Sequence, residues 1–486
     1  CERGSAKAHM PLPDLIEVVP LSPEALARLK AAPAQIAIPG SKSITNRAIV
    51  LAALGDGAVT LQGALWSEDT EAMTECMRTL GINVEVAADP LNAANRRITV
   101  HGCGGAVPPG GTEEAPTELF VANAGTAARF LTAMVCLGSG VYRLSGVPRM
   151  HERPQAELVR ALRALGYRVD TPNERLPALV HGGGPRPGPV LVSVSDSSQF
   201  ASALLLSSAR GGWVVSTPEG SNPDELPYVE MTRRLVETFP HGGGDFQVEP
   251  DASSASYFHA ANALFPDHLP VRVLACQPPK REGGTGWQID AEFPRLAPTA
   301  AAEGDNGGGD GDGGAAADPA KRAKLAPRVI SRHAPTDLGD SVMTAIAIAP
   351  LASQPHAFAS LGVLRKQECE RVAALRDELR KCKASVEEEV ATDTLSIAPT
   401  AAASLGDATV ATYHDHRMAM CFATLALKVR GIKIEGPRCV RKTVPSFFQI
   451  LAASPPSGLG VEVWECDAAT GERLRRLEAP EDLFAA

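Results

Sequence analysis

Apolar positions along the chain repeat at helical spacing and then give way to short apolar runs that are typical of strands. The change is clear in 77–86 (MRTLGINVEV) and 161–170 (ALRALGYRVD), where a helix ends near a glycine and a strand follows. Weaker examples are 231–239 and 375–388. Helices and strands alternate throughout, which predicts an α/β fold made of several similar units.

The segment 37–55 (AIPGSKSITNRAIVLAALG) places positive charge at the start of a helix. Its pattern predicts a strand end, a glycine turn and an apolar helix that closes at Gly55. Lys42 and Arg47 fall at or near the N-terminal end, and Ser43 shares a face with Arg47. That end already carries partial positive charge, so cations are favourable there only if an anion lies beside them.

Polar or basic residues also open three other predicted helices. They are Asn123 and Arg129 in 123–138, Asp196, Ser197, Ser198 and Gln199 in 195–211, and His416 and Arg417 in 412–431, with Lys428 and Arg430 at the end of the last helix. Ordinary helix capping explains serine, asparagine and aspartate at such positions. It does not explain the arginines, so we interpret these helix starts as converging on a ligand that carries phosphate or carboxylate groups.

Further basic residues occupy predicted loops. The segment 146–154 (GVPRMHERP) offers Arg149 and Arg153 before a helix that Pro154 starts, and 441–448 (RKTVPSFF) offers Lys442. A single arginine in a loop is usually a solvated surface residue. Several of them around strand–helix junctions favour an anion site.

Two carboxylates also stand out. Asp340 precedes an apolar helix, and Glu368 is followed three residues later by Arg371 on the same predicted helix face. They are either a helix cap and an exposed ion pair, which is the commoner case, or groups that transfer protons in a closed pocket.

Composition limits the functional classes. The formal net charge of −9 and the pI near 5.7 argue against broad binding to nucleic acid or to an anionic membrane. No apolar run reaches the length of about 18 residues that a membrane span needs. The ten cysteines show no metal-ligand spacing and fit a reducing compartment, so we expect a cytoplasmic protein without a metal.

Two segments stand apart from this globular pattern. The stretch 297–327 is rich in glycine, alanine and aspartate, and we expect it to be a disordered insertion in a loop. The chain starts with cysteine instead of methionine, which agrees with a piece of a longer polypeptide.

Seven stretches together resemble the 5-enolpyruvylshikimate-3-phosphate (EPSP) synthase family. In order along the chain they are PGSKSITNRAIVLAALG, NAGTAARFLTAM, GVPRMHERP, DSSQFASALLL, DASSASYF, TYHDHRMAMCFATLAL and RKTVPSFF. The form NAGTAARF is similar to the version within the fungal multifunctional shikimate-pathway polypeptide, so other domains of that pathway are possible partners in one chain.

The resemblance implies a two-domain inside-out α/β barrel of six βαβαββ units. One domain would comprise 1–38 and 249–486, and the other 39–248. It also implies transfer of the enolpyruvyl group of phosphoenolpyruvate to the 5-hydroxyl of shikimate 3-phosphate, with release of phosphate and without a cofactor. Glyphosate, which takes the phosphoenolpyruvate site in the family, is expected to inhibit.

The resemblance also assigns roles to individual residues. Lys42, Asp340 and Glu368 would transfer protons. The residues that would hold shikimate 3-phosphate are Ser43, Arg47, Ser197, Ser198 and Gln199. Those that would hold phosphoenolpyruvate, together with Lys42, are Gly125, Arg129, Arg149, Arg371, Arg417 and Lys442.

Some positions depart from the family pattern. Glu225 stands where the family usually has a serine, and Gln367 and Val363 replace a lysine and an asparagine, with Lys366 one position away. These departures keep a non-catalytic or impaired relative open as an alternative. A second alternative is the UDP-N-acetylglucosamine enolpyruvyl transferase of the same fold.

Overall fold

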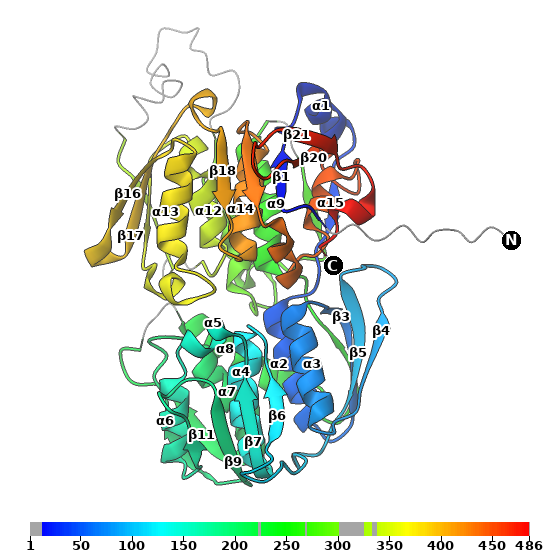
Figure 1. Cartoon of the computed structure of the whole chain (residues 1–486), viewed down its shortest axis with the longest axis vertical. Coiled ribbons are helices and arrows are strands. Elements are labelled where there is room, and N and C mark those ends of the chain that lie inside the picture. Colours follow the sequence, from blue (N-terminus) through cyan, green and yellow to red (C-terminus); the bar gives the residue numbers. More distant parts are fainter. Residues whose placement is uncertain (1–11, 222–224, 268–269, 301–324, 333–337, 486) are drawn as a thin grey trace, which may run out of the picture.

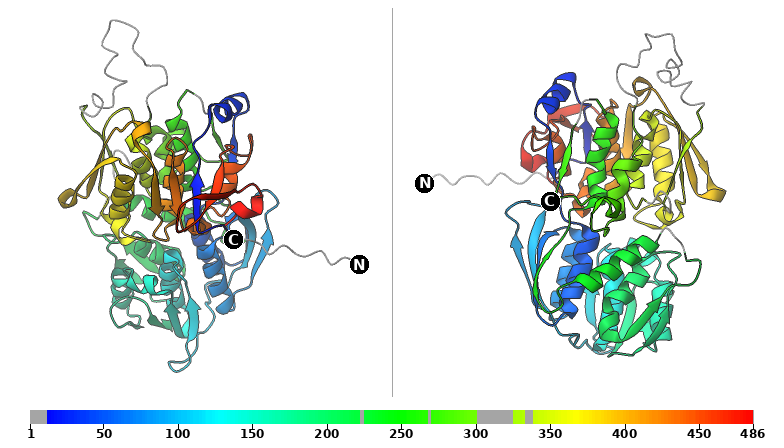
Figure 2. Two further views of the ribbon diagram at one scale, coloured as in Figure 1. Left: turned by 45° about the horizontal axis from the view of Figure 1, so that its top comes forward. Right: turned by 180° about the vertical axis from the view of Figure 1, so that it is seen from behind.

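The molecule has two hydrophobic cores. The computed structural model describes residues 12–221, 225–267, 270–300, 325–332 and 338–485. One core takes its side chains from 44–248 and the other from 12–38 and 255–485. They correspond to the lower and upper halves of Figure 1, and Figure 2 shows the same division from two further sides. This partition supports the predicted domain boundaries near residues 38 and 248, which stay a prediction.

Six sheets surround these cores, and three of them share one topology. Their strand orders are β12-β3-β5-β4, β6-β7-β9-β8 and β14-β15-β17-β16. In each sheet the first two strands are parallel and the remaining pairs are antiparallel. Parallel neighbours need a crossover, which helices supply. The strands are β3 (Ala58–Leu65), β4 (Val84–Ala88), β5 (Asn95–His101), β6 (Thr117–Phe120), β7 (Ser139–Ser145), β8 (Val169–Asp170), β9 (Ala178–Gly183), β12 (Gly244–Gln247), β14 (Arg328–Ser331), β15 (His356–Ala359), β16 (Ser385–Glu389) and β17 (Thr394–Ala398).

The other three sheets are variations on this unit. Two of them keep a single parallel pair, β10-β11 and β13-β2, and the third has the order β18-β19-β1-β20-β21. Their strands are β1 (Leu15–Val18), β2 (Gln35–Ala37), β10 (Gly188–Leu191), β11 (Trp213–Ser216), β13 (Arg272–Leu274), β18 (Ala408–Ala411), β19 (Ile432–Glu435), β20 (Val463–Cys466) and β21 (Arg473–Arg476). The six sheets and the helices they enclose confirm the expected inside-out α/β fold.

Each half contains three inner helices that pack on one another. They are α2 (Lys42–Leu54), α4 (Gly125–Met134) and α7 (Gln199–Gly211) in the lower half, and α9 (Ala252–Leu264), α12 (Val342–Ile348) and α14 (His416–Ala426) in the upper half. Every residue of α4, α12 and α14 is buried. Helices that are apolar on all sides belong inside a core, which explains why these sequences lack one polar face.

The remaining helices cover the outside and keep one polar face. For example, α6 buries Leu158, Val159, Ala161 and Leu162 and leaves its charged residues outside. These helices are α1 (Pro23–Ala31), α3 (Glu68–Thr79), α5 (Pro148–Glu152), α6 (Ala156–Ala164), α8 (Leu226–Thr238), α10 (Phe293–Leu296), α13 (Arg371–Lys381) and α15 (Phe447–Ala452). Within the described residues no helix is long and apolar enough to cross a membrane.

The chain crosses between the halves twice, and the two crossings pair with each other. Gly40 and Pro250 form an antiparallel bridge, and the Ser41 amide donates to the Glu249 carbonyl at 2.7 Å. A Cβ atom on Gly40 would lie 2.0 Å from the Gly63 carbonyl oxygen, so only glycine fits this close approach. The paired crossings hold the starts of α2 and α9 next to each other.

Several local expectations differ from the structure. Ala124, and not Asn123, occupies the N-cap of α4, and α6 starts at Ala156, two residues after Pro154. Lys428 lies beyond the end of α14, where it donates to the Leu264 carbonyl. Glu368 precedes α13 and shares no helix face with Arg371.

The expected insertion 297–327 lies mostly outside the described residues. Its first residues are ordered, because Ala297 and Ala300 are buried and Ala300 bridges to Ala352. The predicted start of the insertion is therefore a few residues too early.

Candidate active site between the two halves

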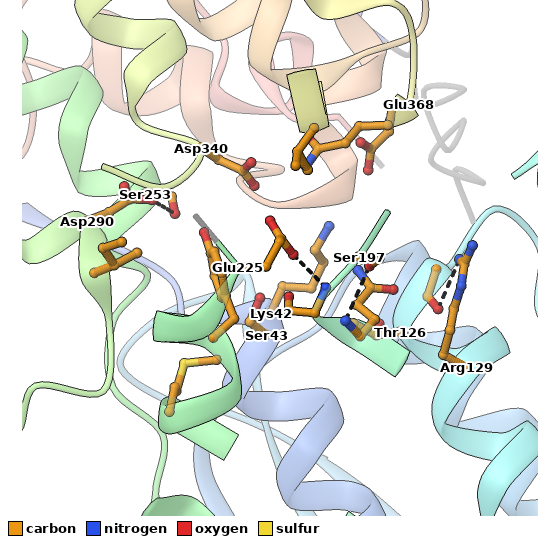
Figure 3. A pocket seen from close by; sticks show the side chains of 18 of the residues that line it. Lys42, Ser43, Thr126, Arg129, Ser197, Glu225, Ser253, Asp290, Asp340 and Glu368 are labelled. Carbon is orange, nitrogen blue, oxygen red and sulfur yellow. Dashed lines mark hydrogen bonds between the residues drawn. The ribbon is translucent and has the colours of Figure 1, made fainter. Parts of the chain in front are cut away.

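The starts of all six inner helices line one cavity between the halves. The lining residues that they contribute are Ser41, Lys42 and Ser43 at α2, Gly125 and Thr126 at α4, Ser198 and Gln199 at α7, Asp251 and Ser253 at α9, Asp340 just before α12, and Arg417 at α14. Figure 3 shows Asp340 and Glu368 pointing into the cavity from above and Lys42, Ser43, Ser197 and Glu225 from below. The positive ends of these helices converge here, which suits an anionic ligand.

Arg47 is a buried cation with neutral partners. Its guanidinium donates to the Thr232 hydroxyl at 2.7 Å, the Ser202 hydroxyl at 3.1 Å and the Ser43 carbonyl at 2.9 Å. No described carboxylate lies within ion-pair distance of it. Burial lowers the pKa of Arg47 to about 10. A buried charge without a counterion is costly, so the site favours an incoming anion.

Arg129 and Arg153 form a second group of buried cations beside the start of α4. Arg129 donates to the carbonyl oxygens of Gly125 and Pro154, and Arg153 donates to the Asn123 carbonyl at 3.0 Å. Neither guanidinium pairs with a carboxylate in the described part of the chain, and the Arg129 Nε is without a hydrogen-bond partner there. Burial, and next the charge of Arg153, lower the pKa of Arg129. This pair is a site for one anionic group.

Gly125 leaves the space between these two arginines and the cavity. A Cβ atom at this position would lie 2.8 Å from the Arg153 Nη2, 2.9 Å from the Arg129 Nη1 and 3.1 Å from the Gln199 Oε1. The missing side chain therefore lets a ligand reach the helix start and both guanidinium groups.

The opposite wall holds Asp340 between two arginines. Its carboxylate lies 2.9 Å from the Arg417 guanidinium and 3.4 Å from that of Arg371. Burial alone would raise the pKa of Asp340, but these cations outweigh burial and lower the pKa to about 2. Asp340 is therefore ionised at any physiological pH and is able to accept a proton.

Glu368 lies between Arg371 at 2.9 Å and the Lys442 ammonium at 3.3 Å. The two cations hold the pKa of the Glu368 carboxyl well below its usual range, against the effect of burial. The Asp415 carboxylate also pairs with the Arg371 guanidinium, at 2.7 Å. The exposed helical ion pair considered from the sequence is therefore wrong, because Arg371 is buried.

Asp69 connects the two lysines across the cavity edge. Lys42 lies 3.0 Å from one of its carboxylate oxygens and Lys442 lies 3.6 Å from the other. Lys442 comes from the upper half and Asp69 from the lower, so this contact joins the halves at the site. Nothing in the sequence pattern singles out Asp69, which is part of the ordinary acidic first turn of α3.

Most of the predicted site residues line the cavity. Those that do are Lys42, Ser43, Arg47, Gly125, Arg129, Ser197, Ser198, Gln199, Asp340, Glu368 and Arg417. Arg371 and Lys442 lie directly behind the wall, through their ion pairs with Glu368.

Arg149 is outside the cavity lining, contrary to its predicted role. The short helix α5 carries it, where it pairs with Glu152 at 2.7 Å and donates to the Gln367 carbonyl at 3.0 Å. Arg153 lines the cavity in its place. The sequence offered both arginines in one predicted loop, and nothing in their spacing showed which one turns inward.

The positions that depart from the family pattern also line the cavity, including Glu225, Lys366, Gln367 and Val363. Lys366 lies 2.5 Å from Asp196 of the opposite half, and the Gln367 side chain contacts Arg371. Asp290, Arg332 and Tyr228 line the cavity too and were missed from the sequence. Among the described residues no group of three or more histidine, cysteine, aspartate or glutamate side chains is arranged to hold a metal.

Comparisons with known proteins match most of the chain to one family. Residues 27–451 match the family described as EPSP synthase (3-phosphoshikimate 1-carboxyvinyltransferase). The 3-phosphoshikimate 1-carboxyvinyltransferase of Trichormus variabilis is 35% identical, covering 85% of this chain and 95% of the relative. That of Opitutus terrae is 36% identical, covering 91% of this chain and 98% of the relative.

Solved structures show the same fold. EPSP synthase from Acinetobacter baumannii superposes with a TM-score of 0.63 at 20% identity, covering 92% of this chain and 99% of that one. The enolpyruvyl transferase NikO from Streptomyces tendae gives a TM-score of 0.59 at 14% identity, covering 97% and 100%. None of these comparisons tests the likeness to the fungal multifunctional polypeptide, which stays a prediction. The sequence relatives cover nearly the whole chain, and the chain belongs to the EPSP synthase (3-phosphoshikimate 1-carboxyvinyltransferase) family.

Proposed function

We propose that this chain transfers the enolpyruvyl group of phosphoenolpyruvate to the 5-hydroxyl of shikimate 3-phosphate and releases phosphate. The observation that carries the proposal is the convergence of six helix starts and three buried arginines, Arg47, Arg129 and Arg153, on one cavity. Two small substrates with several negative charges match these helix starts and these arginines, which have no carboxylate partner among the described residues. The family assignment favours this reaction over the UDP-N-acetylglucosamine transferase and over a non-catalytic relative.

The two groups of cations divide the substrates between them. Arg129, Arg153 and the open start of α4 at Gly125 hold phosphoenolpyruvate. Arg47 and Ser43 hold one anionic group of shikimate 3-phosphate, and the start of α7, with Ser197, Ser198 and Gln199, holds another. This division follows from where the groups lie. Gly125, at the start of α4, adjoins the guanidinium groups of Arg129 and Arg153, whereas Arg47 lies on α2.

Asp340 and Glu368 provide the proton transfers. Asp340 is ionised and removes the 5-hydroxyl proton while the oxygen attacks the substituted carbon of the enol. The Lys42 ammonium gives a proton to the methylene carbon, which becomes a methyl group, because Glu368 is ionised beside Arg371 and Lys442. In the second step the Glu368 carboxylate removes a proton from that methyl group while phosphate leaves. Glu368 then returns its proton to Lys42 and Asp340 gives the hydroxyl proton to the departing phosphate, so the protons balance over the reaction.

The surrounding cations stabilise charge that develops on the departing phosphate. Their effect is greatest when water is excluded, because electrostatic interactions are stronger in a medium of low polarity. The contacts of Lys442 with Asp69 and of Lys366 with Asp196 join the two halves across the cavity and serve this closure.

Two broader expectations are also proposals. A cytoplasmic location rests on the dispersed thiols, of which all that lie in the described residues are free. Attachment to other shikimate-pathway domains rests only on the resemblance of NAGTAARF to the fungal form. Fractionation of the source cells tests the location. The mass of the native polypeptide tests the attachment to other domains.

An assay of phosphate release tests the function. We expect release only when phosphoenolpyruvate and shikimate 3-phosphate are both present, with formation of an equal amount of the enolpyruvyl ether. Calorimetry must also show that shikimate 3-phosphate binds to the folded protein. Absence of both turnover and binding would overturn the proposal.

A further inference from the structure

Glu225 places a buried carboxylate at the start of α7, inside the cavity that binds the substrates. Glu225 is only 4% exposed, and one of its carboxylate oxygens accepts a hydrogen bond from the Ser198 amide at 2.6 Å. Ser198 is the N-cap of α7. The carboxylate therefore occupies a backbone donor at the helix start where the proposed function places an anionic group of shikimate 3-phosphate. We take that group to be the phosphate, because backbone N–H groups at a helix start bind phosphate.

A carboxylate and a phosphate cannot both hold this donor in their charged forms. Each accepts a hydrogen bond from the same N–H group, and two anions in a dry pocket repel each other. The chain must therefore remove one of the charges, or move the glutamate, when phosphate arrives. Glu225 lies directly before α8, and α8 packs against α7, so its backbone has little room to move away.

Charges of both signs surround Glu225. The charged and titratable groups that face it within the described part of the chain are Arg332, Asp340, Arg47 and Tyr228. The Arg332 guanidinium is 3.9 Å away, at the limit of an ion pair. Burial raises the pKa of Glu225 and the charge of Asp340 adds to this, while Arg332 and the hydrogen bonds from Ser198 oppose it.

We propose that Glu225 takes up a proton when the phosphate of shikimate 3-phosphate binds, so that this substrate is recognised together with a proton. In its neutral form Glu225 has an O–H group that donates to a phosphate oxygen, and it releases the Ser198 amide to the same phosphate. The inference rests on the proposed function, because it takes shikimate 3-phosphate as the ligand of this cavity.

The direction of the pH dependence follows from linkage. Bound phosphate favours the neutral carboxyl, so it raises the pKa of Glu225 above its value in the free protein. Between those two values binding draws about one proton from solvent, and affinity falls about tenfold for each unit of rising pH. A phosphate monoester is already fully ionised above about pH 7, so its own titration adds little there.

Calorimetry of shikimate 3-phosphate binding tests this inference. Titrations at about pH 8 in two buffers with different ionisation enthalpies give the number of protons taken up. We expect about one for the wild type and a value near zero for Glu225→Gln. The affinity of that variant at about pH 8 is expected to exceed the wild-type value by about tenfold or more, and to change little with pH.

Glu230→Gln is the matched control. Glu230 lies on the same helix but points outward, where it pairs with Arg234 at 2.8 Å and is about half exposed. Its variant is expected to keep the wild-type proton uptake and affinity. Unphosphorylated shikimate is the matched ligand, and its binding is expected to take up no proton.

The outcomes separate this inference from the proposed function. If the wild type binds and turns over shikimate 3-phosphate without proton uptake, or if Glu225→Gln keeps the full uptake, the inference is overturned while the function stands. If the wild type shows neither binding nor turnover, both are overturned. Should Glu225→Gln fail to fold, the wild-type measurement still decides, and Glu225→Ser serves as a second variant.

Discussion

Arginine side chains at the cavity fall into two groups that their neighbours distinguish. Arg371 and Arg417 pair with carboxylates, whereas Arg47, Arg129 and Arg153 have only neutral partners among the described residues. Paired arginines shape the wall and fix the charge of Asp340. The arginines without carboxylate partners are the ones that gain most from a bound anion, because their burial is otherwise uncompensated.

Separate substitutions of Arg153 and of Arg149 test this distinction. Arg153→Gln is expected to raise the KM for phosphoenolpyruvate by about 10- to 100-fold, since a buried charge-assisted contact is lost. Arg149→Gln serves as the control and is expected to change it by less than about threefold, because the pair of Arg149 with Glu152 is exposed. The KM values are measured by phosphate release. Equal increases in the two variants would show that a place in the cavity lining does not identify the arginine that binds phosphoenolpyruvate.

Gly125→Ala is expected to weaken the site without unfolding the protein. The added Cβ would meet the mobile ends of Arg129, Arg153 and Gln199, which are able to shift by a few tenths of an ångström. We expect a higher KM for phosphoenolpyruvate, by about tenfold, and weaker inhibition by glyphosate. Inhibition curves of both proteins check this, and an unchanged glyphosate response in an active variant would place the inhibitor elsewhere.

Asp340→Asn is expected to lower kcat by about 10²- to 10⁴-fold, the usual contribution of a general base. The pKa of Asp340 is lowered to about 2, so its carboxylate is ionised above that pH and protonated only below it. Titration of Asp340 therefore adds no pH dependence to the wild-type rate near neutrality, and the loss of rate in the variant is expected to be similar at every pH tested. Rate profiles between about pH 6 and 9 measure this, and a kcat within tenfold of wild type would remove Asp340 from the role of base.

At the scale of elements, periodicity identified the helices and strands but not their caps. The helix that the sequence places between Lys42 and Gly55 is α2, with Gly55 as its C-cap. The expected cap at Asn123 and the start at Pro154 are wrong, because α4 and α6 begin where tertiary contacts fix the chain. Cap positions depend on backbone angles that residue spacing does not report.

Capping of α9 provides a test at this scale. The Asp251 carboxylate accepts from the Ser254 amide at 2.9 Å and also lies 3.4 Å from the Lys42 amide of α2. Asp251→Ala is expected to lower the thermal midpoint by a few degrees, corresponding to about 1 kcal/mol, and also to reduce kcat/KM, because it loosens the start of α2.

Ser22→Ala is the control, because Ser22 caps α1 far from the cavity, with its hydroxyl 3.2 Å from the Ala25 amide. It is expected to cost a similar amount of stability and to leave kcat/KM unchanged. If both variants affect activity equally, the cap of α9 has no specific connection to the site.

On the scale of the whole molecule, the two halves meet through the paired crossings at Gly40 and Pro250 and through ion pairs around the cavity. Both halves contribute groups to the cavity, so we expect bound substrates to favour an arrangement in which the halves lie close together.

Lys366→Ala tests the contribution of one contact between the halves. Lys366 lies 2.5 Å from Asp196, next to Ser197, so its loss is expected to raise the KM for shikimate 3-phosphate by about three- to tenfold with little change in thermal midpoint. Lys383→Ala is the control, since the exposed pair of Lys383 with Asp407 lies away from the cavity lining. Equal KM values for the two variants would contradict a role of Lys366 in substrate binding.

The sequence by itself determined the α/β class, the helices that begin with cations and most residues of the site. Those features depend on local periodicity and on the charge at helix ends, which a linear chain displays. Only the tertiary structure decided that Arg153 lines the cavity while Arg149 lies outside its lining, and that Asp69 belongs to the site. These assignments depend on which side chains from distant segments share one buried volume, and no local pattern records that.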